Sequence, residues 1–111
     1  MELSAIKKSL KEHGFWHCSG GKSLSHPHAT EMWQFKTFDA DGKIKYFITA
    51  YLYDGVVSRL PAGIAFDSAM YQPGRPDEWI TAQLNGATVD RAIEFFADTY
   101  DKLGCEPDRH N

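Results

Sequence analysis

Four side chains of the types that bind metal ions lie near one another in the sequence: His17, Cys18, His26 and His28. A cysteine thiolate and histidine imidazoles are ligands that zinc favours, and a His-x-His pair on a strand places both imidazoles on one face. Pro27 disturbs regular strand pairing between two of the histidines, however, and no second Cys-containing motif follows. The residues therefore allow two interpretations. We favour solvated loop histidines with no cofactor; the alternative is a metal-binding or metal-dependent catalytic module that holds zinc.

Enzymatic chemistry without a metal would need a nucleophile, a base and an orienting group in a recognisable arrangement. Cys18 lies among histidines, but no signature of a cysteine nucleophile surrounds it. Asp39 and Asp41 form a carboxylate pair within a turn sequence, and forming that turn is a sufficient role for both. We therefore expect a non-catalytic protein.

The most informative feature is an alternating stretch, Lys43–Tyr53, which predicts a strand. Its even positions from Ile44 to Leu52 are almost wholly apolar, so we expect them to face the core. The opposite face then carries a lysine and three aromatic residues, Lys45, Phe47, Tyr51 and Tyr53. If exposed, these residues mark a surface for a protein partner, or for stacking single-stranded bases. The other possibility is that the 16–30 segment or an element containing Trp79 covers them.

A second candidate surface lies on the last predicted helix. Four acidic residues, Asp90, Glu94, Asp98 and Asp101, recur at helical spacing and form one row. Like charges at this spacing are locally unfavourable, so the row can serve a basic partner, or it can be an ordinary solvated face. We include these four residues in the candidate partner-binding surface.

Periodicity and turn residues predict the elements that position these groups. A helix over Glu2–His13 ends at Gly14, which suits a left-handed residue after the helix. Thr88 is placed to cap the last helix. The other predicted elements are strands at Glu31–Phe38, Lys43–Tyr53, Val56–Leu60 and Ile64–Tyr71, a short helix at Glu78–Leu84 and a long helix at Val89–Leu103; a short strand at Phe15–Ser19 is an option.

This element order predicts an α+β fold of a single domain, residues 1–111. Links of hairpin length make neighbouring strands antiparallel. Two amphipathic helices need an apolar surface, and one face of the sheet supplies it. We therefore expect a two-layer sandwich: an antiparallel sheet of three to four strands, with the N-terminal and C-terminal helices packed on one face, in the order α-β-β-β-(β)-α-α.

Composition narrows the class of protein. The chain has 111 residues, two cysteines and a net charge of −3, made up of +2 in residues 1–60 and −5 in residues 61–111. A general nucleic-acid binder would carry a clear basic excess, so nucleic acid is not the expected partner. The N-terminus lacks the apolar run of a secretory signal, and no stretch is long enough to span a bilayer. We expect a cytoplasmic protein with reduced thiols and no membrane partner.

The sequence thus predicts a small intracellular binding or inhibitory module that acts by protein–protein contact, of the accessory type found in bacteria and their phages. Two alternatives stay open: the metal-dependent module described above, and a single-stranded nucleic-acid binder that uses the aromatic sheet face. An unpaired outer strand near Val56–Leu60 or Glu31–Phe38 would also suit a homodimer.

Overall fold

The computed structural model describes residues 3–18, 26–38, 42, 44–54, 63–71, 79–85 and 88–102. A helix, a five-stranded antiparallel sheet and a second helix follow one another along the chain, so the predicted α+β class is confirmed. The elements are α1 (Leu3–Glu12), β1 (Trp16–Cys18), β2 (Glu31–Phe38), β3 (Ile44–Tyr53), β4 (Gly63–Tyr71), β5 (Trp79–Asn85) and α2 (Val89–Lys102).

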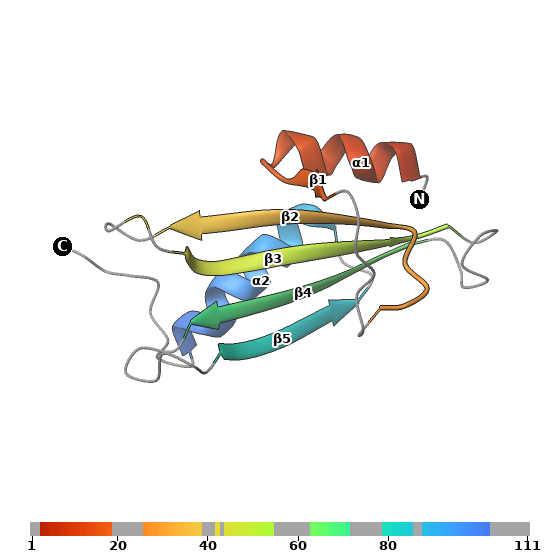
Figure 1. Cartoon of the computed structure of the whole chain (residues 1–111). Coiled ribbons are helices and arrows are strands. Elements are labelled where there is room, and N and C mark those ends of the chain that lie inside the picture. Colours follow the sequence, from red (N-terminus) through yellow and green to blue (C-terminus); the bar gives the residue numbers. More distant parts are fainter. Residues whose placement is uncertain are drawn as a thin grey trace.

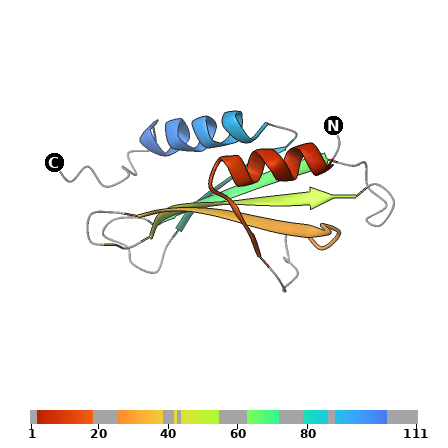
Figure 2. The ribbon, with the colours of Figure 1, turned by 90° about the horizontal axis from the view of Figure 1, so that it is seen from above.

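The sheet is a meander in which each strand pairs with the next one in the sequence (Figure 1). Every neighbouring pair is antiparallel, and the register is regular except for a shift between Thr37 and Phe38 in β2. Both helices lie on the same side of this sheet, as the view from above shows (Figure 2). The opposite face of the sheet has no helix over it among the described residues.

One predicted element is wrong. Residues 79–85 form strand β5 and not the short helix expected over Glu78–Leu84. Asp77 is a residue type that caps helices, but Ile80 and Thr81 are β-branched and Trp79 is aromatic, and these types favour strands. Pairing with β4 decides the outcome, because every residue of β5 has a partner there. The sheet therefore has five strands where three to four were expected. The predicted strand Val56–Leu60 lies outside the described residues.

The end of α1 is built as the sequence predicts. Gly14 has a φ of 87°, which is left-handed backbone that favours glycine. The amide of Gly14 donates to the carbonyl of Lys11, and the amide of Phe15 donates to the carbonyl of Leu10. These two bonds are the pattern that closes a helix after a left-handed residue. Phe15 then folds back and is only 4% exposed.

Thr88 caps α2, as predicted. Its carbonyl accepts a hydrogen bond from the amide of Ala92, and its hydroxyl accepts one from the amide of Arg91 at 3.4 Å. The start of α2 is also joined to the end of α1, because Nε2 of His13 forms an ion pair with the carboxylate of Asp90. The two helices are thus fixed side by side on the sheet.

The core lies between the helices and the even-numbered face of β3. Ile48, Ala50 and Leu52 are fully buried there, which confirms the predicted core face. The core also takes in apolar residues from α1, β2, β4 and α2 and from the residue before β1, namely Ile6, Leu10, Phe15, Trp33, Phe66, Met70, Val89, Ala92 and Phe96. None of the helices in the described ranges has the length and apolar character needed to cross a bilayer.

Candidate functional site

The candidate site lies on the outer face, by which we mean the sheet face that points away from both helices. Strand alternation and register define its residues. In β3 they are the odd positions, including Phe47, Thr49, Tyr51 and Tyr53, and their partners in β4 are Ala69, Asp67, Ala65 and Gly63. Thr81 and Gln83 of β5 pair with Ala69 and Asp67 and continue the face to the sheet edge.

Tyr51 is buried on this face, so for this residue the possibility that another segment covers it is the correct one. Tyr51 is only 8% exposed, although neither of the two described helices covers it. The imidazole of His26 stacks on it, with ring centroids 4.0 Å apart and an interplanar angle of 22°. The start of the 26–30 segment therefore covers this end of the strip. The sequence allows this arrangement, because the 16–30 segment is one of the two elements that could cover the aromatic residues.

His26 is held by two further contacts that bridge β3 and β4. Its Nε2 lies 2.9 Å from Oδ2 of Asp67, and its Nδ1 lies 2.5 Å from the hydroxyl of Tyr53. A neutral imidazole satisfies both contacts when Nε2 carries the proton. In that state Nε2–H donates to Asp67, and the Tyr53 hydroxyl donates to Nδ1. The three side chains form one connected hydrogen-bonded chain.

The Tyr53 hydroxyl stays protonated in this arrangement. Burial raises the pKa of Tyr53 above its ordinary value of 10.0, and the neighbouring Asp67 and Tyr51 raise it further. A phenol with a raised pKa is a good donor and a poor nucleophile at neutral pH. The Asp67–His26–Tyr53 chain therefore suits a positioning role, in which it fixes the 26–30 segment and the Asp67 carboxylate.

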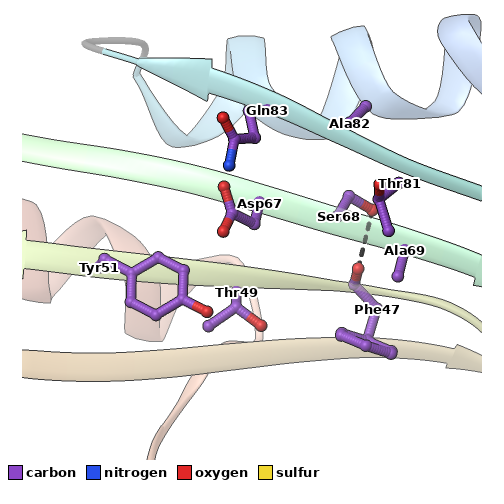
Figure 3. A pocket seen from close by; sticks show the side chains of 9 residues that line it. All are labelled: Phe47, Thr49, Tyr51, Asp67, Ser68, Ala69, Thr81, Ala82 and Gln83. Atoms are coloured by element: carbon purple, nitrogen blue, oxygen red, sulfur yellow. Dashed lines mark hydrogen bonds between the residues drawn. The ribbon is translucent and has the colours of Figure 1, made fainter. Parts of the chain in front are cut away.

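A pocket of about 560 Å³ lies next to this network on the outer face (Figure 3). Nine residues from three neighbouring strands line it: Phe47, Thr49, Tyr51, Asp67, Ser68, Ala69, Thr81, Ala82 and Gln83. The rings of Phe47 and Tyr51 come from β3, while β5 supplies the exposed rim residues Thr81 and Gln83. Asp67 is the one charged residue among the nine.

The Asp67 carboxylate is oriented but not fully satisfied. Its side chain is 22% exposed, and Oδ2 is bonded to His26. The other oxygen, Oδ1, is buried and has no hydrogen-bond partner within the part of the chain that the structure describes. A buried carboxylate oxygen without a partner carries a desolvation cost that a donor would offset. The pocket thus combines aromatic walls with a partly exposed carboxylate whose Oδ2 already has His26 as a partner.

The four residues of the proposed metal cluster do not gather at one point. His17 lies on the helix-covered face, where its ring packs 5.2 Å from that of Trp33. Cys18, the next residue, pairs with Met32 and points to the outer face. Both ring nitrogens of His26 are engaged by Asp67 and Tyr53, and His28 is exposed. The described ranges contain no group of three or more His, Cys, Asp or Glu side chains placed to hold a metal ion.

The candidate partner-binding residues fall on two separate surfaces. Phe47, Tyr51 and Tyr53 belong to the outer face, whereas Asp90, Glu94 and Asp98 are exposed on α2, on the other side of the sheet. Asp90 is engaged by His13, so the acidic row is partly used within the chain. The side chains of Lys45 and Asp101 lie outside what the structure describes.

Two residues of the outer face had no clear signal in the sequence. Trp16 is 44% exposed in β1, and Nζ of Lys36 lies 5.5 Å from the centroid of its ring. Asp67 was assigned only to an alternating strand, because nothing local shows that His26 reaches it. Alternation does place both residues on one face once the pairing is known.

Comparison with known proteins does not assign this surface. No family model matches the chain, and neither a curated protein nor a solved structure matches it significantly.

Proposed function

We propose that this chain is a small non-catalytic binding protein that docks a protein partner on its outer face. The observation that carries the proposal is the pocket between the Phe47 and Tyr51 rings and the Asp67 carboxylate, on the sheet face that neither described helix covers. The exposed Trp16 ring extends this face at the far side of the sheet. Aromatic residues beside a pocket are typical anchors of protein interfaces.

The chemistry of the pocket suits a basic side chain. An arginine or lysine can lay its apolar stem along aromatic rings while its charged head meets a carboxylate. Here Phe47 and Tyr51 supply the rings and Asp67 supplies the charge. The exposed Thr81 hydroxyl and Gln83 amide at the rim can accept the remaining donors of a guanidinium. The occupant we propose is therefore a loop of a protein partner that presents an arginine or lysine.

Electrostatics favours such a partner over nucleic acid. The described residues that line the pocket include one carboxylate and no lysine or arginine, so a phosphate backbone would be repelled there. The whole chain carries a net charge of −3, which adds to this preference.

A titration with short peptides tests the proposal. Amide resonances of the isotopically labelled chain are followed while the capped tripeptide Ala-Arg-Ala or its control Ala-Gln-Ala is added. We expect the arginine peptide to shift the resonances of Asp67, Gln83 and their neighbours at millimolar concentration, and the glutamine peptide to leave them in place. Phe47→Leu, which removes a ring but keeps an apolar side chain, should weaken binding about three-fold.

Asp67→Asn should weaken arginine binding about ten-fold, because it removes the charge that pairs with the guanidinium. Glu94→Gln on α2 is the matched control, since it removes one negative charge from the opposite side of the sheet. Equal shifts with the two peptides, or equal losses in the Asp67 and Glu94 variants, would contradict the proposal.

A further inference from the structure

Strand β5 ends the sheet, and its outer edge is not paired within the described residues. All seven residues from Trp79 to Asn85 pair with β4 on the inner side. An edge of this length presents a row of backbone N–H and C=O groups that can pair with another strand.

The edge of β5 also lacks the features that usually prevent such pairing. Proteins protect edges with very short strands, charged residues, proline or bulges. The opposite edge follows this rule, because β1 has three residues and Lys36 lies beside it in β2. Strand β5 contains no charged residue and no proline, and its register with β4 is regular.

We propose that β5 pairs antiparallel with β5 of a second copy of this chain, about a two-fold axis at Ala82. The two sheets then form one continuous sheet with five strands from each copy. This register places Thr81 of each copy opposite Gln83 of the other, so two exposed polar residues that can hydrogen-bond share one face. It also sets position 80 opposite position 84, and both are aliphatic in the sequence.

The strand itself argues for a second copy as the occupant. Read outward from Ala82, its neighbours are of the same kind in both directions, polar at positions 81 and 83 and aliphatic at 80 and 84. A two-fold interface requires this self-complementarity, because each position before Ala82 meets the matching position after Ala82 in the other copy, and the reverse. Since β5 carries no charge, the pairing opposes no like charges. On the helix side, Ala82 and Leu84 remain partly exposed and gain cover from the second copy.

An exposed aromatic residue on α2 supports the same interface. Asp90 marks the flank of α2 that faces α1, because it pairs with His13. Phe95 comes five positions later, about 140° further round a helix of 3.6 residues per turn, and so lies on the opposite flank. It is 39% exposed. Figure 1 shows β5 on the side of α2 away from α1, so this ring faces the side on which the second copy joins.

The pairing would also complete the pocket. Thr81, Ala82 and Gln83 form its rim at the sheet edge. In the dimer this rim adjoins the same residues of the second copy, and the two pockets lie on one face on either side of the two-fold axis. The dimer would therefore carry two pockets side by side. Dimer formation itself does not require that either pocket is occupied.

Light scattering on the eluting peak of a gel-filtration column tests this inference. We expect the wild-type chain at high micromolar concentration to have a mass of about 25 kDa, twice the 12.5 kDa of one chain. The double variant T81K/Q83K places lysine opposite lysine across the axis and should elute at the monomer mass. The matched variant T81K/Q83E places lysine opposite glutamate in the same register and should remain a dimer. Circular dichroism checks that both variants are folded.

Three results would overturn the inference. They are a wild-type mass of one chain at every concentration tried, a dimer that both variants retain, and loss of the dimer in both folded variants alike. The first excludes self-association, the second places the interface elsewhere, and the third rejects the register about Ala82. None of these results bears on peptide binding at the pocket, which is measured separately.

Discussion

The imidazole of His26 stacks on the ring of Tyr51, with 4.0 Å between the ring centroids. This contact joins a segment between β1 and β2 to the centre of the sheet. It accounts for the burial of Tyr51 on the face opposite the two described helices, and it places His26 where it can bond Asp67 and Tyr53. The stack is therefore part of the structure that positions the pocket.

Tyr51→Ala should destabilise the protein by about 3 kcal/mol, because it removes a buried ring and leaves a cavity under His26. Urea unfolding followed by circular dichroism measures the change. Phe38→Ala is the control, since that ring is 55% exposed, and its effect should stay within about 0.5 kcal/mol. Equal effects of the two substitutions would show that Tyr51 is not packed as described.

His26→Ala tests the same stacking contact by removing the imidazole instead of the Tyr51 ring. The double variant with Tyr51→Ala should be more stable than the sum of the single effects predicts, by about 1 kcal/mol, because the stack is lost only once. The measurement is a double-mutant cycle in urea. Strict additivity would mean that the two rings do not interact.

Ile48→Asp should abolish folding, because Ile48 is fully buried at the centre of β3 and a carboxylate there would have no partner. Ile44→Asp is a matched control in the same strand, since Ile44 is 36% exposed. Thermal unfolding should show a cooperative transition for the Ile44 variant and none for the Ile48 variant. A cooperative transition in the Ile48 variant would contradict the core assignment.

Stability should fall as the pH rises through the titration of His13. A hydrogen bond to the Ser9 carbonyl and the contact with Asp90 raise the pKa of His13 above its ordinary value of 6.5. The folded state therefore holds this proton more tightly than the unfolded state does. The stabilisation is fully present below pH 6.5 and is lost above it, as the pH passes the raised pKa. Thermal melts across this range measure it, and Asp90→Asn should flatten the dependence.

Cys18 should react slowly with iodoacetamide at neutral pH. Burial raises the pKa of Cys18, and Lys36 only partly opposes this, so the reactive thiolate is scarce. Mass spectrometry of the Cys105→Ser protein follows the reaction at one site. Labelling should accelerate in urea, where the thiol is exposed. Labelling of the folded chain as fast as in urea would contradict the described environment.

Elements defined by nearby residues could be predicted from the sequence. The apolar stripe of α1, the Gly14 stop, the Thr88 cap and the alternation in β3 depend on neighbours within a few positions. Each of these features stabilises its helix or strand through neighbouring residues, and tertiary packing adds to that stabilisation.

Features that depend on distant residues could not be predicted in the same way. The residue types of β5 favour a strand only weakly, and pairing with β4 decides that it forms one. His26 and Asp67 are 41 positions apart, and only the register of β3 and β4 brings them together. The stack of His26 on Tyr51 cannot be predicted from the spacing of these residues in the sequence. The pocket, which depends on all three strands, is therefore a property of the fold rather than of a motif.

The ion pair between His13 and Asp90 forms late in folding, because it needs both helices. It spans 77 positions and joins the helix made before the sheet to the helix made after it. The meander can assemble hairpin by hairpin during synthesis, but Leu10 and Phe96 share one core that needs both helices. The apolar face of the sheet is thus fully buried only after α2 has been synthesised and packs on it. Until then the apolar side of the sheet lacks the cover that α2 gives it.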